Sequence, residues 1–363
     1  MTHLNELYLI LNKYLKWNKS HLKCFALIML VIILKQTCNL SSASKALPIK
    51  CLPQSFYRRM QRFFAGQYFD YRQISQLIFN MFSFDQVQLT LDRTNWKWGK
   101  RNINILMLAI VYRGIAIPIL WTLLNKRGNS DTKERIALIQ RFIAIFGKDR
   151  IVNVFADREF IGEQWFTWLI EQDINFCMRV KKNFIVNNHL GKNHKISDLF
   201  RHLKVGQIEC RKRRILVGRV KLYLSALQLE IGELLLLVSP KFNANVLQDY
   251  ALPAELETFF SCLKGRGFNL ENTRLTDPRR VKKLIAVLAI SFCWCYLTGE
   301  WQHDQKKAIK IKKHGRLSMS LFRYGLDYVQ MAIQRLIGFG KKEEFKEILA
   351  ILRRQNPDRI RVL

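Results

Sequence analysis

The most constraining feature of this sequence is a change in the spacing of its apolar residues near position 86. From 86 to 92, polar and apolar side chains alternate, as they do in a strand with one buried face. Two apolar runs follow, at 103–112 and 115–124, and they flank Arg113-Gly114. Such runs around a short turn predict a β-hairpin. The sequence therefore predicts a sheet that begins with three successive strands.

Helices and short strands alternate in the next segment. The pattern predicts a helix capped by Asp131, a buried strand, a second helix and another strand, over residues 132–146, 151–155, 163–171 and 175–180. Parallel neighbours in a sheet need a crossover connection of this kind. Three strands followed by helix, strand, helix and strand is the order of a ribonuclease-H-like fold. We therefore expect an α/β protein with a ribonuclease-H-like core.

Helical regions are expected on both sides of this core, and an all-β insertion is expected to interrupt it. Asn39 and Pro53 are suited to start helices in the N-terminal region. The sequence predicts five segments: a helical DNA-binding head at 1–80, the first part of the core at 81–180, a basic β-rich insertion at 181–245, core helices at 246–298 and a basic helical C-terminal region at 299–363.

The charge of the chain narrows the class of partner. Lys and Arg number 60 against 28 Asp and Glu, a formal charge of +32, and 49% of the residues are hydrophobic. Intrinsic disorder combines high charge with low hydrophobicity, so this composition excludes it. So large a positive charge also argues against a small metabolic enzyme and favours a polyanionic partner. Nucleic acid and an anionic membrane surface are the two candidates.

No membrane partner is expected. The apolar stretch 284–297 has fourteen residues, whereas a spanning helix needs about 20. Residues 1–15 contain Glu6 and lack a cleavage-site pattern, so we expect no signal peptide. The eight cysteines show no zinc-ligand spacing, which favours reduced, mostly buried thiols in a cytoplasm.

Three carboxylates fall where metal-dependent chemistry needs them. Asp92 lies at or near the end of the first strand, Asp157 directly follows the fourth, and Glu257 begins a helix after the insertion. The first and fourth strands are neighbours in a ribonuclease-H-like fold, so the two aspartates converge and the helix adds Glu257. Carboxylates this close repel one another unless a hard cation, Mg²⁺ or Mn²⁺, neutralises them. Taken singly, each acid also suits a turn or a helix start.

The residues around these acids resemble the DDE transposases of the bacterial "insertion sequence four" family. That family has the signature Y-(2)-R-(3)-E-(6)-K, and Tyr250, Glu257 and Lys264 stand at its offsets. An insertion between the second Asp and the Glu is also typical of the family. The blocks that carry the resemblance are residues 91–99, 155–160 and 257–273.

The resemblance implies roles for these residues. Asp92, Asp157 and Glu257 would be catalytic and would bind two Mg²⁺ or Mn²⁺ ions, and Tyr250 and Lys264 would contact DNA phosphate. The implied reaction is hydrolysis at the end of an insertion sequence, after which the released 3′-OH attacks the opposite strand or target DNA. A homodimer on paired, double-stranded transposon ends and a bacterial cytoplasmic location follow from the same resemblance.

One position departs from the signature, because Pro253 stands where the family has Arg. Proline cannot replace the bidentate grip of a guanidinium on phosphate. A catalytically impaired relic that still binds DNA is therefore one alternative. A nuclease of the same fold that cuts without strand transfer is the other.

Several further basic and aromatic residues are candidates for contacts with DNA, and most of them also have a structural interpretation. Arg266 is placed to meet phosphate, and Arg211 and Arg213 lie on a basic strand that either contacts the DNA backbone or forms a solvated edge. Trp96 and Trp98 suit base stacking or core packing. An internal ion pair is expected for Arg158 and Glu159 in preference to metal ligation.

Overall fold

The structure is a computed structural model that describes residues 2–47, 51–98, 101–187, 192–230, 232–247, 260, 262–265, 267–313 and 315–353. Its chain divides into two compact units. The helical unit comprises Met1–Phe84, Trp96–Ile103 and Thr258–Arg361, and the sheet unit comprises Asp85–Asn95, Asn104–Glu257 and Val362–Leu363.

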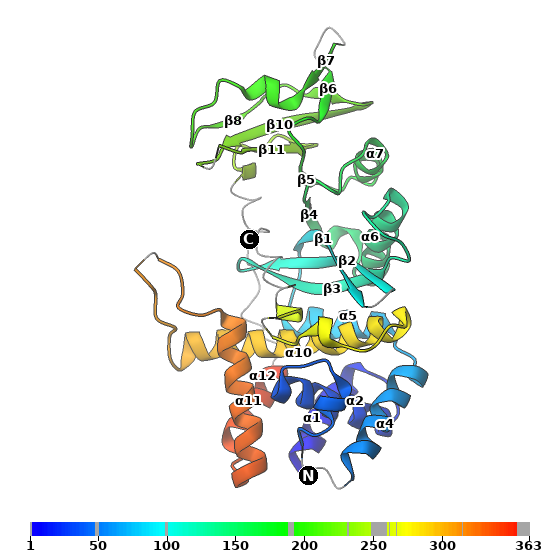
Figure 1. Ribbon diagram of the computed structural model, residues 1–363. Coiled ribbons are helices and arrows are strands. Elements are labelled where there is room, and N and C mark those ends of the chain that lie inside the picture. The colour runs from blue at the N-terminus through cyan, green and yellow to red at the C-terminus, as the bar shows by residue number, and fades with distance from the viewer. Residues whose placement is uncertain are drawn as a thin grey trace. The chain divides into compact units, whose positions relative to one another are not determined.

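Helices from both ends of the chain form the helical unit (Figure 1). Pro53 is the first residue of its helix, and the side chain of Asn39 caps another by accepting the backbone N–H groups of Ser41 and Ser42, as the sequence predicts. The helices are α1 (Thr2–Tyr14), α2 (Lys19–Lys35), α3 (Leu40–Ala43), α4 (Pro53–Gly66), α5 (Tyr71–Met81), η4 (Leu270–Asn272), α10 (Pro278–Gln305), α11 (Leu321–Phe339) and α12 (Glu343–Arg353).

Helix α10 forms the centre of the helical unit. It is long and apolar enough to cross a membrane, but 89% of its most apolar window is buried inside the protein, as in the core helix that the sequence predicts. Helices α1 and α2 pass the same test only as a pair, and they meet at a bend of 112°. Helices α10 and α11 cross at Gly299 and Gly325, where an added Cβ would overlap the backbone of the other helix. This crossing holds the C-terminal helices tightly together.

The sheet unit is built on the strands that the sequence predicts. The first three are β1 (Val87–Trp98), β2 (Arg101–Tyr112) and β3 (Ile115–Leu123). Arg113 and Gly114 join the last two with φ angles of 44° and 76°, which is the left-handed pair that a two-residue hairpin turn requires. Helix α6 (Thr132–Phe146) follows with a capping box between Asp131 and Glu134. Then come β4 (Ile151–Ala156), α7 (Glu163–Glu171) and β5 (Phe176–Arg179).

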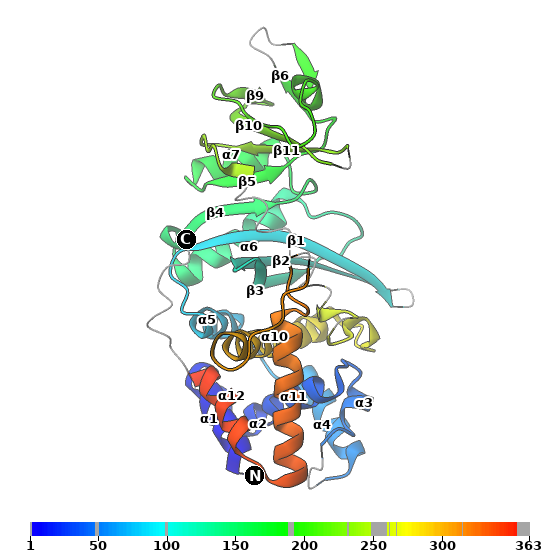
Figure 2. The same ribbon diagram turned by 90° about the vertical axis from the view of Figure 1, so that its left-hand side faces the viewer.

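The order across the sheet is β3-β2-β1-β4-β5, with β1 parallel to β4 and β4 parallel to β5 (Figure 2). The predicted sequence of three strands, helix, strand, helix and strand is confirmed. One detail is wrong, because Asp92 does not lie at the end of its strand. Strand β1 continues to Trp98 beside β2 after its pairing with β4 has ended at Leu91.

The basic segment after β5 extends the same sheet. Strand β11 pairs with β5 through Leu237 and Val238, so the order continues β11-β10-β9-β6-β7, with β8 on β10. The segment is not wholly β, because η2 (Ile196–Phe200) lies within it. Its strands are β6 (Ile185–Asn187), β7 (Asn193–Lys195), β8 (Ile208–Cys210), β9 (Ile215–Val217), β10 (Val220–Gln228) and β11 (Leu234–Ser239).

The predicted C-terminal helical region also contains a non-helical segment. Between α10 and α11 the chain forms a short antiparallel bridge, Ile311 to Leu317, which the basic composition of this stretch did not indicate. Six of the eight cysteines are buried, as the sequence predicts.

Candidate active site

The sheet brings Asp92 and Asp157 together. In the parallel pairing of β1 and β4, Leu91 is the partner of Ala156, and each aspartate is the next residue along its chain. Neighbouring strands lie about 5 Å apart, so the two aspartates start from adjacent backbone positions. The predicted convergence of these residues is therefore a direct result of strand register.

Asp92 is the more buried of the two carboxyls. Burial raises its pKa to about 7, and the negative charges of Glu159 and Asp157 act in the same direction. The Arg93 backbone N–H opposes this effect by donating to Asp92 Oδ1 at 2.6 Å. By contrast, the Asp157 side chain is 51% exposed. The pair therefore combines a desolvated carboxyl that resists ionisation with an accessible carboxylate beside it.

Arg93 joins the two segments that carry these aspartates. Its Nε donates to Glu159 Oε1 at 2.8 Å and one terminal nitrogen donates to Glu159 Oε2 at 3.1 Å. Both side chains are largely buried, with exposed fractions of 13% and 23%. The strand pairing lies just before Asp92 and Asp157, and this bidentate ion pair lies just after them. The backbone is thus cross-linked on both sides of the aspartates, an arrangement we call the Arg93–Glu159 cross-link.

Asparagine side chains complete the environment of Arg93. Its guanidinium also donates to the Oδ1 atoms of Asn104 at 3.1 Å, Asn129 at 3.3 Å and Asn95 at 3.4 Å. Asn104 is 1% exposed and is oriented by its own bonds to the carbonyls of Lys126 and Gly128. A planar, five-donor guanidinium suits such a set of acceptors better than an ammonium does.

A second buried arginine holds the loop that follows β4. The Arg135 guanidinium donates to the carbonyl oxygens of Glu159 at 3.0 Å and Ile161 at 3.3 Å. It also binds the hydroxyl and carbonyl of Ser130 and lies over the Phe160 ring, 5.3 Å from its centroid. The loop that carries Asp157 is therefore fixed by its main chain as well as by the Glu159 side chain.

The expected ion pair at Arg158 and Glu159 forms with other partners. Glu159 pairs with Arg93, whereas Arg158 lies 3.5 Å from Glu233. Arg179 on β5 also binds Glu233, at 2.8 Å, and its other terminal nitrogen lies 3.9 Å from Asp157. These contacts place positive charge at the exposed side of Asp157.

The donor chemistry of Asp92 and Asp157 fits a hard divalent cation. Both supply oxygen only, and a nearby cation would offset the cost of ionising Asp92. Among the described residues, no three His, Cys, Asp or Glu side chains are close enough to form a complete metal site. The third predicted ligand, Glu257, lies outside the described residues, as do Tyr250, Pro253 and Arg266.

Lys264, the signature lysine, is described within the helical unit. It lies in a turn, where its Nζ is 3.0 Å from Glu271 and 6.0 Å from the centre of the Trp96 ring. Trp96 is 8% exposed, which agrees with its interpretation as a packing residue, whereas Trp98 is 38% exposed.

The prediction that Arg211 and Arg213 lie on a strand is wrong, because the chain turns between β8, which ends at Cys210, and β9, which begins at Ile215. The two arginines in this connection differ in accessibility. Arg211 is held by the protein itself, since it donates to the Leu199 carbonyl at 2.7 Å, pairs with Glu209 and lies over the Phe200 ring. Arg213 is exposed. Arg213 is consequently the better placed of the two for an external phosphate.

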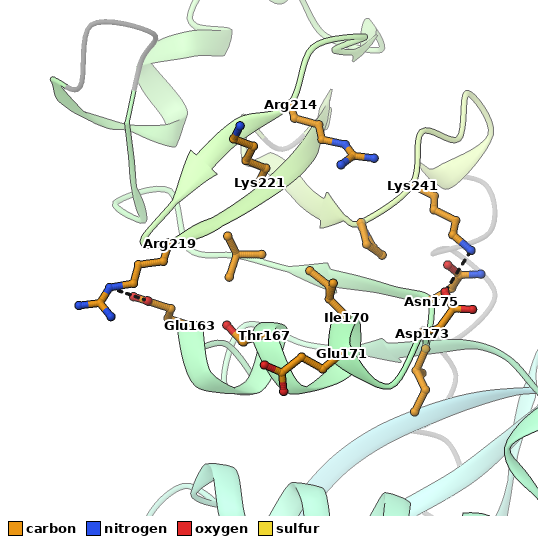
Figure 3. Close-up of a pocket in the computed structure, with 13 residues that line it drawn as sticks. Glu163, Thr167, Ile170, Glu171, Asp173, Asn175, Arg214, Arg219, Lys221 and Lys241 are labelled. Atoms are coloured by element: carbon orange, nitrogen blue, oxygen red, sulfur yellow. Dashed lines mark ion pairs between the residues drawn. The ribbon is translucent and has the colours of Figure 1, made fainter.

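A groove of about 600 Å³ lies between α7 and the insertion strands, and neither aspartate lines it (Figure 3). Acidic residues come from the side of α7 and basic residues from the insertion. Two ion pairs join the sides, Arg219 to Glu163 at 3.7 Å and Lys241 to Asp173 at 3.6 Å. Because its charges are mixed and partly paired internally, the groove does not present the uniformly positive surface that a nucleic acid needs.

Sequence reasoning missed Arg93 and Arg135 as residues of the site. The sequence did offer a signal for Arg93 and its partner Glu159. Arg93 directly follows the first aspartate and Glu159 lies two residues after the second, so both belong to the blocks that carry the family resemblance. Arg135 carries no such signal, because it lies inside an ordinary helical pattern.

Comparison with known proteins adds a family match. A family model described as a transposase DDE domain matches residues 83–294. No curated protein matches the chain. Among solved structures, the chain is similar to one titled "Cryo-EM structure of piggyBac transposase synaptic complex with hairpin DNA", with 13% identity and a TM-score of 0.47. That similarity covers 98% of this chain and 84% of the other.

Proposed function

The chain belongs to the transposase DDE domain family, and on this premise we propose that it cuts DNA at the ends of a bacterial insertion sequence and joins them to target DNA. The observation that carries the proposal is the adjacent register of Asp92 and Asp157, with Asp92 half-buried and its pKa raised to about 7. The strand order β3-β2-β1-β4-β5 supports a ribonuclease-H-like core around them.

In this proposal, Asp92, Asp157 and Glu257 hold two Mg²⁺ or Mn²⁺ ions. When bound, such ions activate the attacking oxygen and stabilise the leaving oxygen of an in-line phosphoryl displacement. The protein's own contribution is positioning: strand register sets the spacing of the two aspartates, and the Arg93–Glu159 cross-link maintains it. Tyr250, Lys264, Arg266 and the insertion arginines Arg211 and Arg213 are proposed to contact DNA phosphate, with Arg213 the most accessible of those described.

The double-stranded ends would be held by a homodimer in the bacterial cytoplasm. Water would attack first, and the released 3′-OH would attack the opposite strand or target DNA. The formal charge of +32 supports a polyanionic partner, because neutralising phosphates releases counterions and favours binding.

A cleavage assay tests this proposal. The purified protein is incubated with a labelled duplex carrying the DNA that flanks its gene, with Mg²⁺ or Mn²⁺, and the products are resolved on a denaturing gel. We expect cation-dependent nicks and joined products, both lost in Asp92→Asn and Asp157→Asn. Asp198→Asn is the matched control, because Asp198 is an ion-paired acid on η2 in the same unit. Nicks that persist in both aspartate variants would refute the proposal.

Pro253 motivates a second candidate, an impaired transposase that binds ends but cuts poorly. The change Pro253→Arg would restore the guanidinium of the family signature, so we expect faster cleavage of end DNA. Equal cleavage rates in the two proteins would eliminate this candidate. A nuclease that does not transfer strands would nick the duplex but yield no joined product.

A further inference from the structure

The chain between α10 and α11 forms a short hairpin-like ribbon with one antiparallel bridge, which we call the basic ribbon (residues 307–313 and 315–319). Ile311 and Leu317 are bridge partners. The Lys312 N–H donates to the Arg316 carbonyl and the Ser318 N–H donates to the Lys310 carbonyl, each at 2.8 Å. Figure 1 shows this segment looping away from the helices that it connects.

The base of the basic ribbon is anchored in the helical unit. Ile309 is 7% exposed, and its N–H donates to His303 Nδ1 at 2.8 Å. The Tyr324 hydroxyl donates to the Lys307 carbonyl at 3.0 Å, and Lys306 forms an ion pair with Glu347. The ribbon is therefore presented by a fixed base, and its described residues beyond Ile309 are exposed.

The two faces of the ribbon differ in chemistry. Bridge partners project on the same side of an antiparallel pair, so Ile311 and Leu317 share a face. They are 69% and 36% exposed, and the part of an apolar side chain that stays in water does not stabilise the fold. Lys310 and Lys312 alternate with Ile311 and therefore belong to the opposite face. The ribbon is thus apolar on one side and basic on the other.

The charge of the segment has a single sign. Residues 307–319 include five Lys and Arg and no Asp or Glu. Closely spaced like charges repel one another, and a polyanion removes that repulsion. Charge complementarity therefore identifies the partner as polyanionic.

We propose that the basic ribbon is a DNA-binding element that lies in the major groove of a duplex. A two-stranded ribbon fits this groove, which is about 12 Å wide. Ile311 and Leu317 would face the base edges, where thymine methyl groups offer apolar contacts. Lys310, Lys312 and Lys313 would reach past the edges of the ribbon to phosphates on the rims, as long lysine side chains do when they cover an apolar surface.

An anionic membrane is the competing partner, and the structure favours DNA over it. Membrane-surface segments are typically amphipathic helices with a continuous apolar face. The ribbon offers only the Ile311–Leu317 pair and the nearby Met319. The inference rests on the proposed function, because it assumes that this family member binds duplex DNA.

The test compares two triple variants that lose the same charge. Lys310→Gln/Lys312→Gln/Lys313→Gln changes the ribbon. Lys341→Gln/Lys342→Gln/Lys346→Gln changes three exposed lysines near the start of α12 in the same unit. Binding of each protein to a fluorescein-labelled 40-base-pair duplex of random sequence is measured by anisotropy between 50 and 200 mM KCl. Thermal unfolding confirms that both variants fold.

Each phosphate contact contributes about 0.9 to the slope of log affinity against log salt, so losing three contacts lowers the slope by about 2.7. Over this salt range the wild type should therefore lose about 40-fold more affinity than the ribbon variant. The α12 variant should keep most of the wild-type slope. Ile311→Ser/Leu317→Ser should weaken binding without changing the slope, because it removes no charge.

Equal slopes for the two lysine variants would overturn the proposal. So would a ribbon variant that keeps DNA affinity but loses binding to vesicles containing 30% anionic lipid. Failure of the proposed function is a separate outcome. A wild type that binds duplex through the ribbon but never nicks its flanking DNA would refute the transposase proposal and leave the ribbon assignment supported.

Discussion

The substitution Asp92→Asn is expected to stabilise the protein while abolishing cleavage. Burial raises the pKa of Asp92 from 3.8 to about 7, so the folded protein resists ionising a carboxyl that the unfolded chain ionises readily. Each pKa unit corresponds to about 1.4 kcal/mol, so the full cost at pH 8 is about 4 kcal/mol. Asparagine keeps a similar shape and an acceptor for the Arg93 N–H but carries no charge.

The sign of the pH dependence follows from linkage. Between pH 3.8 and 7 the unfolded chain releases the Asp92 proton and the folded protein retains it, so wild-type stability from this group is lost as pH rises. The variant has no such loss. Its advantage over the wild type should increase by about 2.5 kcal/mol from pH 5 to pH 8.

Urea unfolding of both proteins at pH 5 and pH 8, in EDTA, measures this advantage. Titrating groups that do not interact with Asp92 contribute equally to the two proteins, so the difference reports on Asp92 and its electrostatic coupling to Asp157 and Glu159. Mg²⁺ should narrow the gap at pH 8 by binding the ionised wild-type carboxylate. A variant that gains the same stability at both pH values, or none, would refute the argument.

Two further predictions concern packing and positioning. Glu159→Gln breaks the bidentate ion pair with the largely buried Arg93 and leaves that guanidinium with amide acceptors only. The free energy of unfolding, measured by urea titration, should therefore fall by about 2 kcal/mol. An unchanged midpoint would show that the pair contributes nothing to stability. Gly325→Ala places a Cβ against the Cys295 carbonyl and should cost about 1–3 kcal/mol by calorimetry, whereas Gly338→Ala has open space and should not destabilise. Similar melting temperatures for these last two variants would contradict the close crossing of α10 and α11.

Local signals in the sequence were sufficient for most elements of the sheet unit. Helix α6 has the predicted bounds because Asp131 and Glu134 form a capping box at its start. The hairpin forms where Arg113-Gly114 interrupts two apolar runs, because these two residues adopt the left-handed conformation that the turn needs. Such signals act over a few residues, so they can be read without knowledge of the rest of the chain.

The convergence of Asp92 and Asp157 was predictable only through an assumed strand order. Once β1 and β4 are neighbours, parallel register brings the residues after Leu91 and Ala156 together. The fact that β1 continues beyond Asp92 was not predictable, because strand length depends on the pairing available from β2.

Tertiary structure alone decided which side chains support the aspartates and where the basic charge is presented. Arg93 and Glu159 are 66 residues apart in sequence, and nothing local to either predicts their bidentate contact. Likewise, the lysines after α10 suggested a basic helix, whereas the Ile311–Leu317 bridge arranges them as a ribbon. Composition and periodicity indicate the secondary structure of each segment. Long-range strand pairing and side-chain contacts determine which residues lie together, and the chemistry proposed for this protein depends on those contacts.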